Sequence, residues 1–180
     1  MDDTLKRIEN IFRSSSSSDD LFDSFQNALK LPITDIEVYK ILLGNPALSG
    51  DEVKMYSEKL IKQFPEQSFE TLFWTGRIFE NQKENLNQLE DSLRYYKRAF
   101  NENPLDERAL VHLLNLYNYE FETATNELII DFVEAAVISV NRKSRVYFNL
   151  SEHFKRLGNI QIAARYLALG EKSAERENDQ

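Results

Sequence analysis

The sequence contains no cysteine, and it has few glycines, few prolines and no long apolar run. Without cysteine the chain forms no disulfide bond and offers no thiolate ligand to zinc. A helix that spans a bilayer needs about 20 mostly apolar residues in a row, so we expect no segment to cross a membrane. The acidic opening, Met1-Asp2-Asp3, differs from the basic and then apolar start of a signal peptide. We therefore expect an intracellular, cytoplasmic protein.

Positive charge is also in short supply. The chain has 30 acidic and 22 basic side chains, which gives a formal net charge of -8 at pH 7. Domains that bind nucleic acids usually carry a basic surface, and an acidic chain repels phosphates. We therefore expect no nucleic-acid partner.

The scarcity of glycine and proline favours an all-α fold. Only five glycines and four prolines interrupt 180 residues, and apolar side chains recur at helical spacing nearly throughout. Breaks are expected at Pro32, at 44–46 and at Pro65. Helices are predicted at residues 4–13, 19–30, 35–43, 50–63, 68–82, 86–101, 106–122, 126–140, 144–157 and 160–175. The short polar loops between them favour antiparallel neighbours.

The first predicted helix is separated from the others by a run of five serines. Apolar residues, Ile8 and Phe12 among them, lie on one side of this helix. A serine run cannot bury apolar area, so we predict a flexible linker whose Ser17 or Ser18 caps the next helix. On this interpretation residues 1–18 form a tethered amphipathic helix and its linker.

Small and aromatic residues recur at helical spacing toward the end of the chain. The pattern is clearest at Tyr147, Leu150, Ser151, Phe154, Gly158, Asn159, Ala163 and Leu167. It resembles the tetratricopeptide repeat (TPR), a helix-turn-helix unit of about 34 residues that buries its apolar face by stacking on neighbouring units. The resemblance implies an antiparallel helix-pair solenoid with a right-handed superhelical twist.

The resemblance divides the chain into three clear repeats and one degenerate repeat. The expected segments are N-terminal helices with the degenerate repeat at 19–65, three repeats at 66–175 and a charged tail at 176–180. In the family, small residues at the eighth and twentieth positions let the two helices of a repeat approach closely. Gly76 and Ser151 meet this requirement at the eighth position. Leu114 stands there in the second repeat and predicts wider packing.

In the family, the first helix of each repeat lines a concave groove. The resemblance places these side chains in the groove: Phe73, Arg77, Arg108, Val111, Asn115, Asn118, Arg145, Phe148 and Lys155. Arginines can clamp carboxylates, asparagines can hold an extended backbone, and phenylalanines can pack on an apolar side chain. The implied ligand is an extended peptide with acidic and apolar residues. Alternatively, the arginines pair with carboxylates of the chain itself, such as Glu70, Asp106 or Glu152.

The last helix offers a second candidate surface. Its candidate interface residues are Ile160, Ile162, Tyr166 and Leu169. The terminal helix of a repeat array is ordinarily polar on its outer side, so this helix is expected to need a cover. Either the tethered first helix or another subunit, as in a homodimer, would supply it. Alternatively, the helix is rich in alanine because it is buried between larger neighbours.

The sequence shows no arrangement of catalytic residues. His112 and His153 have no nucleophile or second histidine at motif spacing, and the glycines form no phosphate-binding loop. Both histidines are expected at the surface or at a boundary. We predict no enzyme activity, no metal site and no cofactor.

The predicted function is a protein-protein interaction module, acting as an adaptor or as a subunit of a larger assembly. This prediction rests on the resemblance, because arrays of this kind present extended binding surfaces. Two alternatives stay open. One is a small TPR-type chaperone for a specific client, and the other is a purely structural helical subunit that binds through its terminal helix.

Overall fold

The computed structural model describes residues 2–31, 33–81, 86–117 and 123–179, and all regular secondary structure in these ranges is helical. The all-α prediction is therefore confirmed. The helices are α1 (Asp2–Ser14), α2 (Ser18–Lys30), α3 (Ile36–Leu43), α4 (Gly50–Gln63), α5 (Ser68–Glu80), α6 (Leu86–Glu102), α7 (Arg108–Asn115), α8 (Thr123–Ala136), α9 (Lys143–Arg156) and α10 (Ile160–Asn178), with a short 3-10 helix at Pro65–Gln67. Within these ranges, no helix combines the length and the apolar character that a membrane span requires.

Short polar side chains begin several of the helices. The predicted cap at Ser17 is confirmed, because its hydroxyl accepts the backbone N–H of Asp20 at the start of α2. The Asp35 carboxylate caps α3 in the same way. At α4, Ser49 and Glu52 form a reciprocal capping box. These contacts satisfy backbone donors that the first turn of a helix leaves without an internal partner.

Several predicted segments have different bounds in the structure, and the helix predicted at 126–140 is shifted, because α8 covers Thr123–Ala136. The helix predicted at 106–122 is wrong in length, because α7 covers only Arg108–Asn115. Asp106 precedes α7, and its carboxylate accepts the backbone N–H of Arg108 at 2.9 Å. The end of that prediction, 118–122, lies outside the described residues. In contrast, α10 continues to Asn178, so the predicted charged tail is largely helical.

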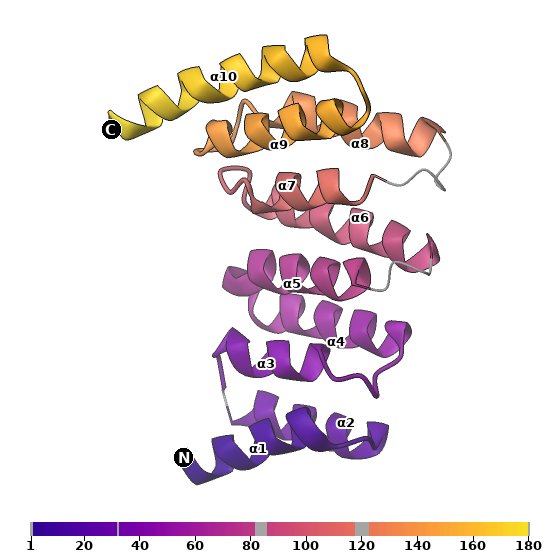
Figure 1. The fold of residues 1–180 in the computed structure, drawn as a ribbon. Helices are drawn as coiled ribbons and strands as arrows, with labels where there is room; N and C mark the ends of the chain where they lie inside the picture. Colours follow the sequence, from indigo (N-terminus) through magenta and orange to yellow (C-terminus); the bar gives the residue numbers. More distant parts are fainter. Residues whose placement is uncertain (1, 32, 82–85, 118–122, 180) are drawn as a thin grey trace.

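The first helix, α1, is packed into the fold. Ile8 and Phe12 are buried, and α1 contacts both α2 and α3. The side-chain amide of Asn45 donates to the carbonyl oxygens of Phe12 at 2.9 Å and Ser15 at 3.0 Å. The prediction of a tethered helix is therefore wrong, because the apolar side of α1 packs on its neighbours and Asn45 holds the end of the helix. Figure 1 places α1 and α10 at opposite ends of the molecule, so α1 does not cover the last helix.

The helices follow one another along a single direction, and the two termini lie at opposite ends (Figure 1). Most consecutive helices contact each other, most extensively α5 with α6 and α9 with α10. Other contacts skip one helix and join α1 to α3, α3 to α5 and α7 to α9. Helix α3 therefore lies beside both α1 and α5, and α7 lies beside α9.

Two helix pairs are joined at close range by a hydroxyl-to-carbonyl hydrogen bond. Ser92 on α6 donates to the carbonyl oxygen of Gly76 on α5, and Ser151 on α9 donates to that of Ala163 on α10, each at 2.8 Å. Among the described residues, α7 packs on α8 less extensively than the helices of these two pairs pack on each other. Leu114 is buried, and the wider packing expected at this position stays a prediction.

Candidate functional site

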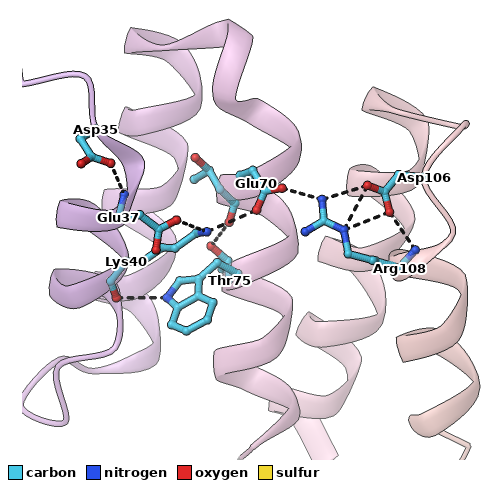
Figure 2. Close-up of polar contacts among 9 residues, drawn as sticks. Asp35, Glu37, Lys40, Glu70, Thr75, Asp106 and Arg108 are labelled. Carbon is cyan, nitrogen blue, oxygen red and sulfur yellow. Dashed lines mark hydrogen bonds and ion pairs between the residues drawn. The ribbon is translucent and has the colours of Figure 1, made fainter.

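A row of alternating charges connects α3, α5 and α7 (Figure 2). Glu70 lies at its centre, with carboxylate oxygens 3.3 Å from Lys40 Nζ and 2.5 Å from Arg108 Nη2. At one end, Glu37 is 2.7 Å from Lys40 Nζ. At the other end, Asp106 accepts hydrogen bonds of 2.9 to 3.1 Å from the Arg108 guanidinium. We call Glu37, Lys40, Glu70, Arg108 and Asp106 the charged row.

The charged row keeps its partly buried carboxylates ionised. Burial alone would raise the pKa of Glu70, but Arg108, followed by Lys40, brings that pKa below its ordinary value. Burial also opposes ionisation of Asp106, and hydrogen bonds from Arg108 again lower the pKa. In return, the hydrogen bonds to Asp106 and then to Glu70 raise the pKa of Arg108. Both carboxylates and the guanidinium are therefore charged at neutral pH.

Aromatic rings pack against the cations of the charged row. The Arg108 guanidinium lies 4.8 Å from the ring centre of Phe69 and 5.0 Å from that of Phe73. The Trp74 indole N–H donates to the Lys40 carbonyl oxygen at 3.1 Å, and its ring centre lies 5.7 Å from Lys40 Nζ. A cation over an aromatic face gains about 0.5–1 kcal/mol at exposed sites. Arg108 is thus held by two carboxylates and by two rings of its own chain.

A second ion pair links α7 to α9. Arg145 Nη1 donates to Glu107 Oε1 at 3.0 Å. The side chain of Arg145 is 52% exposed, whereas Glu107 is buried. A guanidinium has five N–H donors, so Arg145 can hold Glu107 and still present donors to a ligand.

The predicted groove residues fall into an inner and an outer group. Phe73 and Val111 are buried, and Arg108 is paired within the charged row. The exposed members are Arg77, Asn115, Arg145 and Lys155. Arg108 and Arg145 both pair with carboxylates of this chain, as the alternative interpretation predicted.

The two remaining residues of the predicted groove are Phe148 and Asn118. Phe148 is partly exposed, and its ring packs directly against Gly170 of α10. At least one side of the Phe148 ring is therefore covered by α10. Asn118 lies outside the described residues. Peptide binding by any of these side chains stays a prediction.

A polar cluster that sequence analysis missed lies between α5, α6 and α7. His112 Nδ1 is 2.7 Å from Glu80 Oε2, and the Tyr96 hydroxyl donates to the same oxygen at 2.5 Å. Burial, and then the charge and hydrogen bond of Glu80, raise the pKa of Tyr96. The ring of Phe73 meets His112 edge-on at 5.1 Å. Glu80 and His112 are 32 residues apart, and no sequence motif links them.

The other histidine is buried. The ring of His153 packs edge-on against Tyr117, with centres 4.6 Å apart, and its Nε2 has no partner among the described residues. Burial, and then the charge of Arg156, lower the pKa of His153. The expectation of a surface or boundary position is wrong for His153, because its ring fills space between α7 and α9.

The candidate interface residues of α10 face different directions. Ile160 is 61% exposed, and Ile162 and Leu169 are half-buried. Tyr166 turns inward, where its ring stacks 5.6 Å from Phe154 and its hydroxyl donates to Glu134. The outward apolar side chains of this helix are thus Ile160 and Leu167, the latter 45% exposed.

Across the described part of the chain, no group of three or more His, Asp or Glu side chains could hold a metal ion. Comparisons with protein-family models, with curated proteins and with solved structures gave no match.

Proposed function

We propose that this protein is a protein-protein interaction module, an adaptor or a subunit of a larger assembly, built as a TPR-like solenoid of antiparallel helix pairs. Its ligand would be an extended, partly acidic peptide bound along the face that α5, α7 and α9 share. Repeat arrays offer such extended surfaces, and each first helix contributes side chains at equivalent positions.

One observation carries this proposal. Glu70 pairs with Arg108, and Glu107 pairs with Arg145, and each pair is separated by 38 residues. Each pair joins the start of one odd-numbered helix to the start of the next, as expected when the first helices of successive repeats stand side by side. The two pairs therefore support both the repeat and the common face of α5, α7 and α9.

The exposed cations on this face favour a ligand with carboxylates. Arg145 retains unused donors, Lys155 lies on the same helix, and Arg77 stacks 5.2 Å from the Trp74 ring while its side chain reaches solvent. Exposed Asn115 on α7 adds an amide that can pair with a peptide backbone. Arg108 and Phe73 would form the wall behind the ligand and not its main contacts.

The test uses the exposed arginines, because charge reversal at Arg108 would also disturb the charged row. Partners would be captured from native lysate with the wild type and with the double variant Arg77→Glu/Arg145→Glu. A matched control, Arg165→Glu/Lys172→Glu, makes the same change of charge on exposed positions of α10. Circular dichroism would verify that all three proteins fold equally.

Loss of a partner in the first variant alone, followed by direct binding of that partner's acidic segment, would support the proposal. A partner that survives the reversal at Arg77 and Arg145 would refute the shared face as its binding site.

A structural subunit that binds through α10 is the second candidate. The exposure of Ile160 and Leu167 on the outward side of the terminal helix favours it, as does the internal pairing of Arg108. In this case Ile160→Glu/Leu167→Glu would abolish assembly, either with a partner or as a homodimer, and sedimentation equilibrium would show the change in mass.

A further inference from the structure

A cleft of about 430 Å³ opens between α2 and α4, away from the charged row. Its floor is aromatic, because the buried rings of Phe25 and Tyr56 meet edge-on with centres 4.7 Å apart. Its rim carries two large apolar side chains, Phe22 and Met55, which are 43% and 47% exposed. The remaining lining residues are Gln26, Glu58, Lys59 and Lys62.

An apolar hollow with apolar side chains on its rim is typical of a binding site. Phe22 and Met55 come from different helices and enclose the same space, so they form one hollowed patch. Methionine adapts its shape to an incoming side chain because it is unbranched and polarizable. The cleft therefore suits one large apolar anchor side chain.

The charge at the rim of the cleft is positive. Glu58 is already engaged, since it accepts hydrogen bonds from Arg98 Nη2 at 3.0 Å and from the Tyr95 hydroxyl at 3.2 Å. The Arg98 hydrogen bond lowers the pKa of Glu58 below its ordinary value. Lys59 and Lys62 are exposed and make no ion pair within the described part of the chain. A basic rim on a protein of net charge -8 is a local feature that selects acidic partners.

We propose that the α2–α4 cleft is a second docking site, which binds a short amphipathic segment of a partner protein. The segment would place one large apolar side chain, such as leucine or phenylalanine, over the Phe25 and Tyr56 rings. Aspartate or glutamate residues beside this anchor would pair with Lys59 and Lys62. The site lies on α2 and α4, whereas the peptide-binding face proposed above lies on α5, α7 and α9, so the two sites can be occupied independently.

The test selects peptides from a displayed random library on the wild-type protein, with counter-selection on Met55→Asp. The recovered peptides should share a large apolar residue with acidic neighbours. Fluorescence anisotropy should then show binding that Met55→Asp weakens by at least about 10-fold, as expected for loss of a central apolar contact. Lys59→Glu/Lys62→Glu should also weaken binding, and added salt should do the same.

Two matched controls separate the cleft from general surface effects. Leu128→Asp introduces the same change at another exposed apolar position, on α8, and Arg165→Glu/Lys172→Glu reverses two exposed cations on α10. Neither should alter binding of the selected peptides. Reversal at Arg77 and Arg145 should not alter it either, so failure of this proposal is distinguishable from failure of the proposed function.

Three outcomes would overturn the cleft proposal. The first is a selection that enriches no peptide dependent on Met55, and the second is enrichment of basic or uncharged peptides insensitive to Lys59 and Lys62. The third is self-association of the wild type in sedimentation velocity that Met55→Asp abolishes, which would assign the cleft to a second copy of this chain.

Discussion

Arg108 on α7 reaches Glu70 on α5, and its Nη2 donates to Glu70 Oε1 at 2.5 Å across 38 residues of sequence. The same guanidinium also holds Asp106 and packs on Phe69 and Phe73. Arg108 therefore joins two helices by charge and by packing at once. An arginine so engaged contributes mainly to the position of α7 relative to α5.

Replacement of Arg108 by alanine should destabilise the protein by about 1–3 kcal/mol, because Glu70 and Asp106 would lose their main partner and Phe69 its cover. Arg145→Ala is the matched control. It removes a single ion pair and no packing on aromatic rings, so the free energy of unfolding should fall by less than for Arg108→Ala. Denaturant titration followed by circular dichroism measures both, and equal losses would contradict a special role for Arg108.

Glu70 should make stability depend on pH in the acid range. Its folded-state pKa lies below the ordinary value of 4.5. Its ionised form therefore stabilises the fold above pH 4.5, and this contribution is lost as pH falls from there through the folded-state pKa. Glu70→Gln should be less stable than the wild type at neutral pH, and the difference should shrink below pH 4.5. A difference that stays constant with pH would contradict this account.

His153 should make the stability of the fold depend on pH in a higher range than Glu70 does. Burial keeps its pKa below the ordinary value of 6.5, so the folded state favours the neutral ring. As pH falls through 6.5 the unfolded chain takes up a proton first, and the fold loses stability until the folded-state pKa is reached. His153→Phe keeps an aromatic ring against Tyr117 and should remove this loss. Thermal unfolding on either side of pH 6.5 tests it, and an equal fall in Tm for both proteins would refute it.

Two glycines on helices should respond differently to alanine. A Cβ at Gly76 would lie 2.7 Å from Cε1 of Tyr96, whose ring is fully buried, so Gly76→Ala should cost about 1–3 kcal/mol. A Cβ at Gly170 would lie 2.6 Å from Cε1 of Phe148, but that ring is partly exposed and can turn away. Helix propensity favours alanine by about 1 kcal/mol, so Gly170→Ala should be close to neutral. Chemical denaturation compares the two, and a larger loss at Gly170 would contradict this argument.

Local sequence patterns predicted most helices because glycine, proline and capping residues mark helix ends. The segment predicted at 50–63 has the observed bounds of α4, where Ser49 forms the capping box. The same patterns predicted α1 as a helix but not its attachment to the rest of the fold. Amphipathicity shows which side of a helix becomes buried and not which neighbour buries it, and the contact that holds α1 comes from Asn45, about 30 residues away along the chain.

The candidate site was only partly predictable for a related reason. The resemblance aligned Glu70, Arg108 and Arg145 at equivalent positions of successive repeats, and the structure does bring Glu70 to Arg108. The sequence left open whether Arg108 pairs with Glu70 and Asp106 or with a ligand, because this choice depends on the distance between two helices. The contact between Glu80 and His112 has no local signal of any kind. Glu80 and His112 meet across 32 residues only because α5 and α7 pack together.

The placement of the two termini at opposite ends of the helical stack has a mechanical consequence (Figure 1). A tension applied between the ends of this chain would load its helix pairs in series and not in parallel. The pair that shares the least contact surface would yield before the others. Within the region from α5 to α10 that pair is α7 with α8, since hydroxyl-to-carbonyl bonds hold α5 to α6 and α9 to α10. The region from α5 to α10 would therefore lengthen in discrete steps under load, beginning at α7 and α8.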